Sequence, residues 1–181
     1  MSAPDLKAVS KQMSWILRHE AERLGMELDP EGYVTIAELV KVMRRTEPQV
    51  TEQLVRAAVE QVELRKQRFS IVEDSIRANY GHSLEMRIDH QPAAPTDALF
   101  HGTTLALRPL ILEQGLRPMQ RQYVHLTPDL DLARSVGGRH GKPCLLRVDA
   151  VRAHGEGLVF YKANRSFWLA GAVPAQYLSA V

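Results

Sequence analysis

Cysteine is nearly absent from this chain, with Cys144 the single one among 181 residues. One thiol excludes an intrachain disulfide and a zinc site built from several cysteines, and it fits a reducing compartment. No apolar run approaches the roughly 20 residues that cross a bilayer. The first seven residues also lack the basic and apolar segments of a signal peptide. We therefore expect a cytoplasmic protein with no membrane partner.

Charge is modest overall but unevenly distributed. Residues 1–92 carry 13 Lys+Arg against 15 Asp+Glu, whereas residues 93–181 carry 10 against 6, and eight of those ten are arginine. The planar guanidinium group suits phosphate better than the point charge of lysine does. The bias indicates a phosphate-bearing partner, although chance in a small sample explains it equally well.

A short segment with two prolines, residues 92–96, interrupts any helix or strand. It predicts a first domain over residues 1–91, a linker over 92–96 and a second domain over 97–181. In the first domain, apolar spacing predicts three helices and two strands, over residues 9–24, 36–45, 52–63, 69–72 and 84–88. Three helices followed by a two-stranded ribbon are typical of a winged-helix module, which commonly binds nucleic acid.

The second domain alternates between the two element types. Strands are expected over residues 98–100, 123–126, 144–148, 158–161 and 167–169. One helix is expected over residues 105–114, closing at Gly115, and another with Thr127 as N-cap and Pro128 as first residue. This order predicts a small α+β domain with a strand-rich core, in which Phe160 and Trp168 serve the packing.

One segment resembles a calcium-binding loop. Glu27-Leu28-Asp29-Pro30-Glu31-Gly32 places glycine sixth, and Glu38 falls at position twelve. Glutamate at position one, proline at position four and the single copy argue against a cation. A turn between a helix and a short strand explains the same residues, so we expect no metal site.

Two His-x-Thr triplets, His101-Gly102-Thr103 and His125-Leu126-Thr127, lie about two dozen residues apart. Paired triplets of this kind perform acid/base catalysis in the two-histidine phosphoesterases, which also act on RNA ends. No repeated lobe surrounds these two. A two-histidine RNA phosphoesterase therefore remains an alternative.

Three further segments concentrate polar side chains. Arg18-His19 lies at the end of the first helix, where Arg18 could instead form a solvated pair with Glu22. The stretch from Ile76 to Ser83 gathers Arg77, an amide, hydroxyls and an imidazole around one glycine. In Arg139-His140-Gly141-Lys142-Pro143, glycines would let backbone amides approach a phosphate, although plain surface charge is the commoner explanation.

In order along the chain, these segments resemble the RNA 2'-phosphotransferases of the KptA type. The resemblance runs from near residue 8 to Tyr177 and rests on Leu17-Arg18-His19, Ile76-Arg77-Ala78-Asn79 with Gly81-His82-Ser83, Phe100-His101-Gly102-Thr103, His125-Leu126-Thr127, Gly138-Arg139-His140-Gly141-Lys142-Pro143 and Phe167-Trp168-Leu169. The chain departs from the family at Tyr80, where glutamine is common, and over residues 164–168.

The resemblance implies an α+β chain with an N-terminal winged-helix-like domain and a C-terminal domain of the ADP-ribosyltransferase fold. It implies removal of an internal 2'-phosphate from RNA in two steps. The 2'-phosphate first attacks the NAD ribose, giving a 2'-phospho-ADP-ribosylated RNA intermediate and nicotinamide. The ribose 2''-hydroxyl then attacks the phosphate, giving 2'-OH RNA and ADP-ribose 1'',2''-cyclic phosphate.

The same resemblance assigns residues to roles. The implied catalytic residues are Arg18, His19, Arg77 and Arg139; the implied NAD-binding residues are His101, Gly102, Thr103, His125 and Thr127; and the implied RNA contacts are Gly81, His82 and Ser83. Arginines suit this chemistry because they orient anions and stabilise charge on phosphoryl oxygens. We expect the first three catalytic residues to hold the 2'-phosphate and Arg139 to reach the ADP-ribose phosphates, which predicts a monomer with its site between the domains.

Two other classes stay open on the sequence. An ADP-ribosyltransferase could use the same NAD site on terminal phosphates of nucleic acid or on another acceptor. The absence of glutamate after Phe160 weakens the version that acts on protein. A non-enzymatic winged-helix protein would bind RNA but not NAD.

Overall fold

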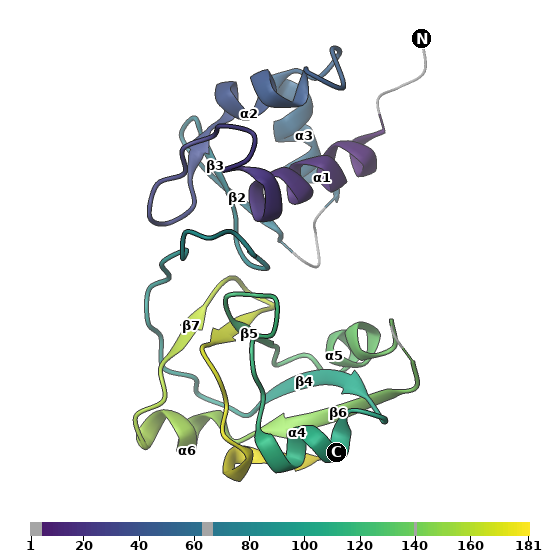
Figure 1. Ribbon diagram of the computed structural model, residues 1–181, viewed down its shortest axis with the longest axis vertical. Helices are drawn as coiled ribbons and strands as arrows, with labels where there is room; N and C mark the ends of the chain where they lie inside the picture. Colours follow the sequence, from purple (N-terminus) through teal and green to yellow (C-terminus); the bar gives the residue numbers. More distant parts are fainter. Residues whose placement is uncertain (1–4, 63–66, 140) are drawn as a thin grey trace. The chain divides into compact units, whose positions relative to one another are not determined.

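The computed structural model describes residues 5–62, 67–139 and 141–181 (Figure 1). These residues combine helices with three small antiparallel sheets, so the predicted mixed α+β class is confirmed. The chain divides into two compact units, Met1–Asp89 and His90–Val181. Each unit has its own buried core.

The first unit begins with three helices at the predicted places. Helix α1 (Leu6–Trp15) continues as a π-helical turn, η1 (Ile16–Glu20), and α2 (Ile36–Met43) follows. Helix α3 (Glu52–Val62) starts after Thr51, whose hydroxyl accepts the N–H of Leu54 at 3.2 Å, as an N-cap does. The predicted end of this helix at Glu63 lies outside the described residues.

The sheet of the first unit differs from the prediction. It contains β1 (Val34–Thr35), β2 (Phe69–Val72) and β3 (Ser75–Ala78) in the order β1-β3-β2. The strand predicted over residues 84–88 is wrong, because the partner of β2 is the tightly connected β3. In the segment after β3, backbone N–H groups are hydrogen-bonded to a side chain and not to a neighbouring strand. The Glu22 carboxylate accepts the N–H groups of Glu85 at 3.1 Å and Met86 at 2.9 Å.

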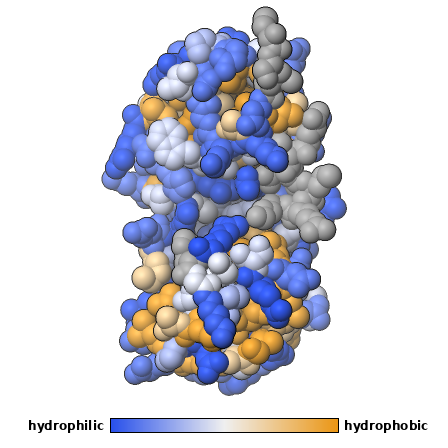
Figure 2. Space-filling model, turned by 90° about the vertical axis from the view of Figure 1, so that its right-hand side faces the viewer, coloured by the Kyte–Doolittle hydropathy of each residue, from blue (hydrophilic) through white to orange (hydrophobic). Residues whose placement is uncertain are grey.

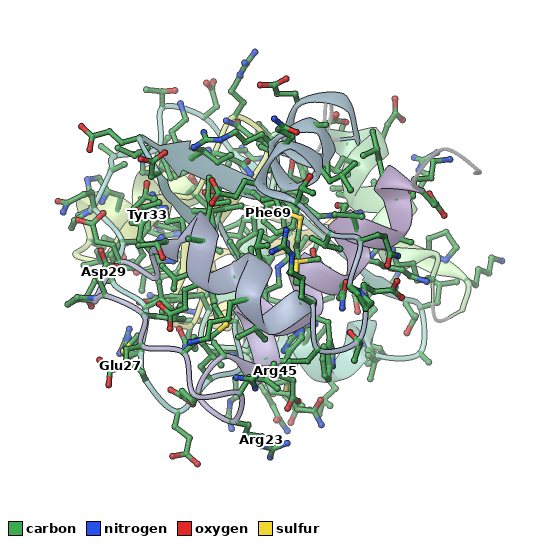
Figure 3. The ribbon with its side chains drawn as sticks, turned by 90° about the horizontal axis from the view of Figure 1, so that it is seen from above. Arg23, Glu27, Asp29, Tyr33, Arg45 and Phe69 are labelled. Carbon is green, nitrogen blue, oxygen red and sulfur yellow. The ribbon has the colours of Figure 1, made fainter. Side chains whose placement is uncertain are left out.

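The core of the first unit fills the space between the helices and the sheet. Its members include the predicted inward positions of the first two helices, namely Val9, Met13, Ile16, Leu17, Leu39, Val40 and Met43. Phe69 is also buried here, and Figure 3 shows it inside the ribbon. Apolar spacing along the helices therefore located their inner faces correctly.

The second unit contains two three-stranded sheets. One has the order β4-β6-β9, formed by β4 (Leu99–Thr104), β6 (Pro143–Val148) and β9 (Leu178–Ala180). The other has the order β5-β8-β7, formed by β5 (Val124–Leu126), β8 (Trp168–Ala170) and β7 (Phe160–Lys162). His101-Gly102-Thr103, which follows the strand predicted over residues 98–100, lies inside β4, so this strand is longer than predicted. Strand β9 was not predicted.

Helices and a 3-10 turn complete this unit: α4 (Arg108–Gln114), α5 (Leu130–Gly137), α6 (Ala150–Gly155) and η2 (Ala175–Tyr177). The expected N-cap at Thr127 is wrong, because α5 is capped by Asp129, whose carboxylate accepts the N–H groups of Asp131 and Leu132. Thr127 is held extended by two backbone hydrogen bonds to Phe100, at 2.7 and 3.0 Å.

Phe160 and Trp168 belong to the second core, as predicted. Figure 2 shows apolar side chains gathered on the face of the second unit that it draws. Among the described helices, none is both long and apolar enough to span a bilayer.

Candidate functional site

Arg18 is positioned by the π-helical turn and by the segment that follows β3. The carbonyl oxygen of Arg18 accepts the N–H of Ser83 at 2.9 Å, and its guanidinium carbon lies 4.9 Å from the centre of the Tyr80 ring. Gly81 has a φ of 91°, in the left-handed region that favours glycine, and a Cβ there would be in ordinary contact with Arg18 Cδ at 3.5 Å. Such π turns widen a helix locally and occur often at functional sites. The structure thus brings Arg18 together with the predicted RNA-contact segment.

His19 belongs to the same cluster. Its Nδ1 lies 2.7 Å from the Ser83 hydroxyl, 64 positions further along the chain, so the two groups share a hydrogen bond. His19 is half-buried and Ser83 is exposed. The bond orients the imidazole ring on the surface of the first unit.

Arg77 lies on β3 and contacts the loop before β1. Its Nη1 donates to the Glu31 carbonyl oxygen at 3.2 Å and lies 3.3 Å from the Glu31 carboxylate. Its guanidinium carbon lies 4.7 Å from the centre of the Tyr33 ring. Strand β3, which carries Arg77, contacts the π-helical turn η1, which carries Arg18.

Asn79, which lies between them in the sequence, has a structural role. It is buried, its side-chain oxygen accepts the Ser70 hydroxyl at 2.7 Å, and its Nδ2 donates to the Gln67 carbonyl at 2.8 Å. Part of the polarity of this segment therefore serves the β2–β3 hairpin. His82 is also buried, whereas Gly81 is half-buried.

In the second unit, the two sheets approach each other at the start of β4 and the end of β5. Among the described residues, β4 and β5 share a single backbone bridge, between Phe100 and Thr127. Just beyond this bridge, a side chain bonds to the backbone of the other strand: the Nδ1 of His101 lies 3.0 Å from the carbonyl oxygen of His125. A carbonyl oxygen only accepts, so Nδ1 carries the proton.

Burial lowers the pKa of His101 below its ordinary value, and the hydrogen bond to His125 opposes this shift without cancelling it. The imidazole is therefore neutral at neutral pH, and its Nε2 has an acceptor lone pair. A neutral ring with a fixed tautomer can accept a hydrogen bond from a hydroxyl or amide of a ligand.

The other predicted NAD residues also have structural contacts. Thr103 and Thr127 are both buried, and the Thr127 hydroxyl accepts the N–H of Asp129 at 3.1 Å. A Cβ on Gly102 would lie 1.8 Å from the carbonyl oxygen of Ala133 in α5. Gly102 thus permits the close packing of α5 against β4, whatever its part in binding.

Arg139 lies just after α5, exposed to solvent, and its backbone N–H donates to the Val136 carbonyl at 3.3 Å. The next predicted residue, His140, lies outside the described residues. A Cβ on Gly137 would lie 2.6 Å from the Thr103 carbonyl oxygen, so this glycine also serves packing. The position of Arg139 is therefore tied to the contact between α5 and β4.

Sequence reasoning missed Glu31 and Tyr33, the neighbours of Arg77. The calcium-like loop was the signal that could have found them, since its twelve positions, residues 27–38, include both. Its Asp29 carboxylate accepts the N–H groups of Glu31 at 2.9 Å and Tyr33 at 2.8 Å, which is a turn, and Figure 3 labels Asp29 and Tyr33 at one edge of the unit. Across the described parts of the chain, no group of three or more His, Cys, Asp or Glu side chains is placed to hold a metal ion.

Comparison with known proteins gives a consistent result. Residues 4–172 match the model of the family described as RNA 2'-phosphotransferase, Tpt1 / KptA family. The chain is 41% identical over 178 residues to a probable RNA 2'-phosphotransferase of Acaryochloris marina, with 97% of each chain covered. It is 42% identical over 172 residues to a probable RNA 2'-phosphotransferase of Thermococcus kodakarensis, with 94% of each chain covered. The resemblance seen in the sequence motifs is confirmed.

Proposed function

The chain belongs to the RNA 2'-phosphotransferase, Tpt1/KptA family and is an enzyme that removes a 2'-phosphate from RNA using NAD, and we propose that Arg18, His19, Arg77 and Arg139 carry out this reaction. Family membership favours this activity over the two-histidine phosphoesterase that the His-x-Thr triplets allowed. NAD is a substrate in this proposal because it is consumed.

Arg18, His19 and Arg77 bind the RNA 2'-phosphate in this proposal. The observation that carries it is that each arginine lies against a tyrosine ring, Arg18 on Tyr80 and Arg77 on Tyr33, on two elements of one unit that contact each other. Guanidinium groups held in this way offer flat, oriented donors to an anion. His19, oriented by Ser83, supplies a further hydrogen bond to the phosphate or moves a proton.

Gly81, His82 and Ser83 contact the RNA strand beside the phosphate. The support is that this segment is joined to Arg18 and His19 through the backbone and hydroxyl of Ser83. Ser83 is exposed and therefore accessible to a strand of RNA. The backbone in this region, at Gly81, also has no side chain to obstruct the approach.

The second unit binds NAD along β4 and β5, through His101, Gly102, Thr103, His125 and Thr127. The side chains here fit such a ligand, because the neutral His101 ring offers Nε2 as a hydrogen-bond acceptor where the two strands share one bridge among the described residues. Arg139, exposed after α5, binds the negative phosphates of the ADP-ribose part. NAD supplies the electrophilic ribose carbon, while these side chains position the reacting groups and offset their charge.

The two units correspond to a winged-helix-like domain over residues 1–91 and an ADP-ribosyltransferase-like domain over residues 97–181 in this proposal. The order of helices and strands in the first unit, with the sheet order β1-β3-β2, supports the winged helix. Two small antiparallel sheets in the second unit support the other assignment. A cytoplasmic monomer that needs no metal completes the proposal.

The test uses a short RNA that carries one internal 2'-phosphate, incubated with the protein with and without NAD. We expect NAD-dependent phosphate removal with release of nicotinamide. Replacing Arg77 with alanine removes a charge-assisted contact and should slow the reaction about a hundredfold or more. The matched control is Arg56→Ala, which removes an ion pair with the exposed Asp74 and exposed hydrogen bonds to the Glu73 carbonyl on the same unit. It should stay within about twofold of wild type. Wild-type rates in Arg77→Ala would refute the phosphate assignment.

A further inference from the structure

Tyr33 is the most closely placed aromatic neighbour of a proposed phosphate-binding arginine, and the motifs did not point to it. The guanidinium carbon of Arg77 lies 4.7 Å from the centre of the Tyr33 ring, within the range of a cation–π contact. The Arg77 side chain is 20% exposed, so water screens this contact only in part. An aromatic face restricts the guanidinium plane without using any of its N–H donors.

The backbone around Tyr33 is firmly fixed. Its N–H donates to the Asp29 carboxylate at 2.8 Å, and its carbonyl oxygen accepts the N–H of Asp29 at 2.9 Å. Tyr33 immediately precedes β1, in which Val34 is paired with Ile76 of β3. Continuing that antiparallel register by one residue sets Tyr33 opposite Arg77, so the ring is presented to the guanidinium from a rigid support.

The hydrogen bonds of Arg77 leave its Nη2 donors for a ligand. Within the part of the chain that the structure describes, all of them run from Nη1, to the carbonyl and the carboxylate of Glu31. Nε is buried and therefore not accessible to a ligand. A guanidinium carries five N–H groups, and the two on Nη2 are neither bonded within the described residues nor buried, so they can donate to a phosphate.

These observations lead to one assignment, which rests on the proposed role of Arg77 in binding the RNA 2'-phosphate. We propose that Tyr33 is a positioning residue for this reaction: its ring sets the plane of the Arg77 guanidinium, while Glu31 occupies Nη1, so that the N–H groups of Nη2 are presented to the phosphate. Tyr33 itself touches neither RNA nor NAD in this arrangement. Its contribution passes entirely through Arg77.

The experiment measures kcat and KM for 2'-phosphorylated RNA and for NAD in Tyr33→Leu, with Tyr33→Ile as a second variant without the ring. We expect kcat/KM for the RNA to fall on the order of tenfold in both, because a misoriented guanidinium stabilises the reacting phosphate less. KM for NAD should stay unchanged. Tyr33→Phe keeps the ring and should restore the rate to within about twofold of wild type.

A double-mutant cycle with Arg77→Lys separates positioning from a general effect on folding. Lysine keeps the charge but has no plane to orient, so removing the ring should change the rate less than about twofold in that background. An equal loss in both backgrounds, a raised KM for NAD, or wild-type rates in Tyr33→Leu would overturn the proposal. Full activity of Arg77→Ala would instead refute the underlying phosphate assignment, so the two failures are distinguishable.

Discussion

Replacing Gly102 with alanine is the sharpest test of the second unit, because the clash involves backbone atoms. The new Cβ would lie 1.8 Å from the carbonyl oxygen and 2.7 Å from the carbonyl carbon of Ala133, and 2.9 Å from the N of Gly137. None of these atoms is the end of a flexible side chain. Helix α5 would therefore have to retreat from β4 by roughly 1.5 Å to restore ordinary contact distances.

The expected cost follows from overpacking. Adding one carbon to a well-packed core costs about 1–3 kcal/mol, and a clash with backbone places this site at or above the upper end. Such a loss should lower the melting temperature of the second unit by about 10 °C or more. The displacement should also reduce activity below the melting temperature, because Arg139 follows α5 directly and a shift of about 1 Å at a positioned group can cost on the order of a hundredfold in rate.

Thermal unfolding followed by circular dichroism, with rates measured well below the transition, checks both effects. Gly155→Ala is the matched control, since a Cβ there meets no atom within 4 Å. It should change stability by less than about 1 kcal/mol. A Gly102→Ala protein with the melting temperature and rate of wild type would refute the argument that α5 packs on β4 at this distance.

Two further outcomes are expected. Ser83→Ala removes the hydroxyl bonded to His19 Nδ1 but keeps the backbone hydrogen bond to Arg18. We therefore expect kcat to fall about two- to tenfold with little change in melting temperature. An unchanged kcat would show that the His19–Ser83 bond does not serve the reaction. Burial lowers the pKa of His101 from its ordinary 6.5, so the unfolded chain protonates this imidazole more readily than the folded chain does. The stability that comes from the neutral ring is therefore present above about pH 6.5 and is lost as the pH falls through the lower pKa of the folded state. The melting temperature should therefore fall less between about pH 7.5 and about pH 5.5 in His101→Asn than in wild type, and equal falls would contradict this sign.

The helices of the first unit were predicted well because their signals are local. Apolar residues at helical spacing marked the buried faces of α1 and α2, and Thr51 caps α3 as its side-chain chemistry requires. The strand expected over residues 84–88 was wrong for the opposite reason. Leu84 and Ile88 are buried as a strand pattern would suggest. The backbone N–H groups between them, however, are bonded by the carboxylate of Glu22, which is distant in sequence.

The candidate site was predicted in part. Motif order identified the family and led to the arginines that we propose. It could not show that the Asn79 side chain is hydrogen-bonded within the β2–β3 hairpin or that Gly102 serves the packing of α5. The predicted strand also ended at residue 100, whereas β4 continues through His101 to Thr104. Residue types show which chemistry is possible, while burial and partners decide which side chains are available for it.

By itself the sequence determined the family, the mixed α+β class and the places of the three helices of the first unit, because motifs, caps and apolar periods act within a few residues. Tertiary structure alone decided which polar groups meet. Arg77 lies against Glu31 from 46 positions away, and His19 bonds to Ser83 from 64 positions away. Such contacts depend on strand register and on how loops dock against helices, and these are set by packing over the whole unit and not by local preference.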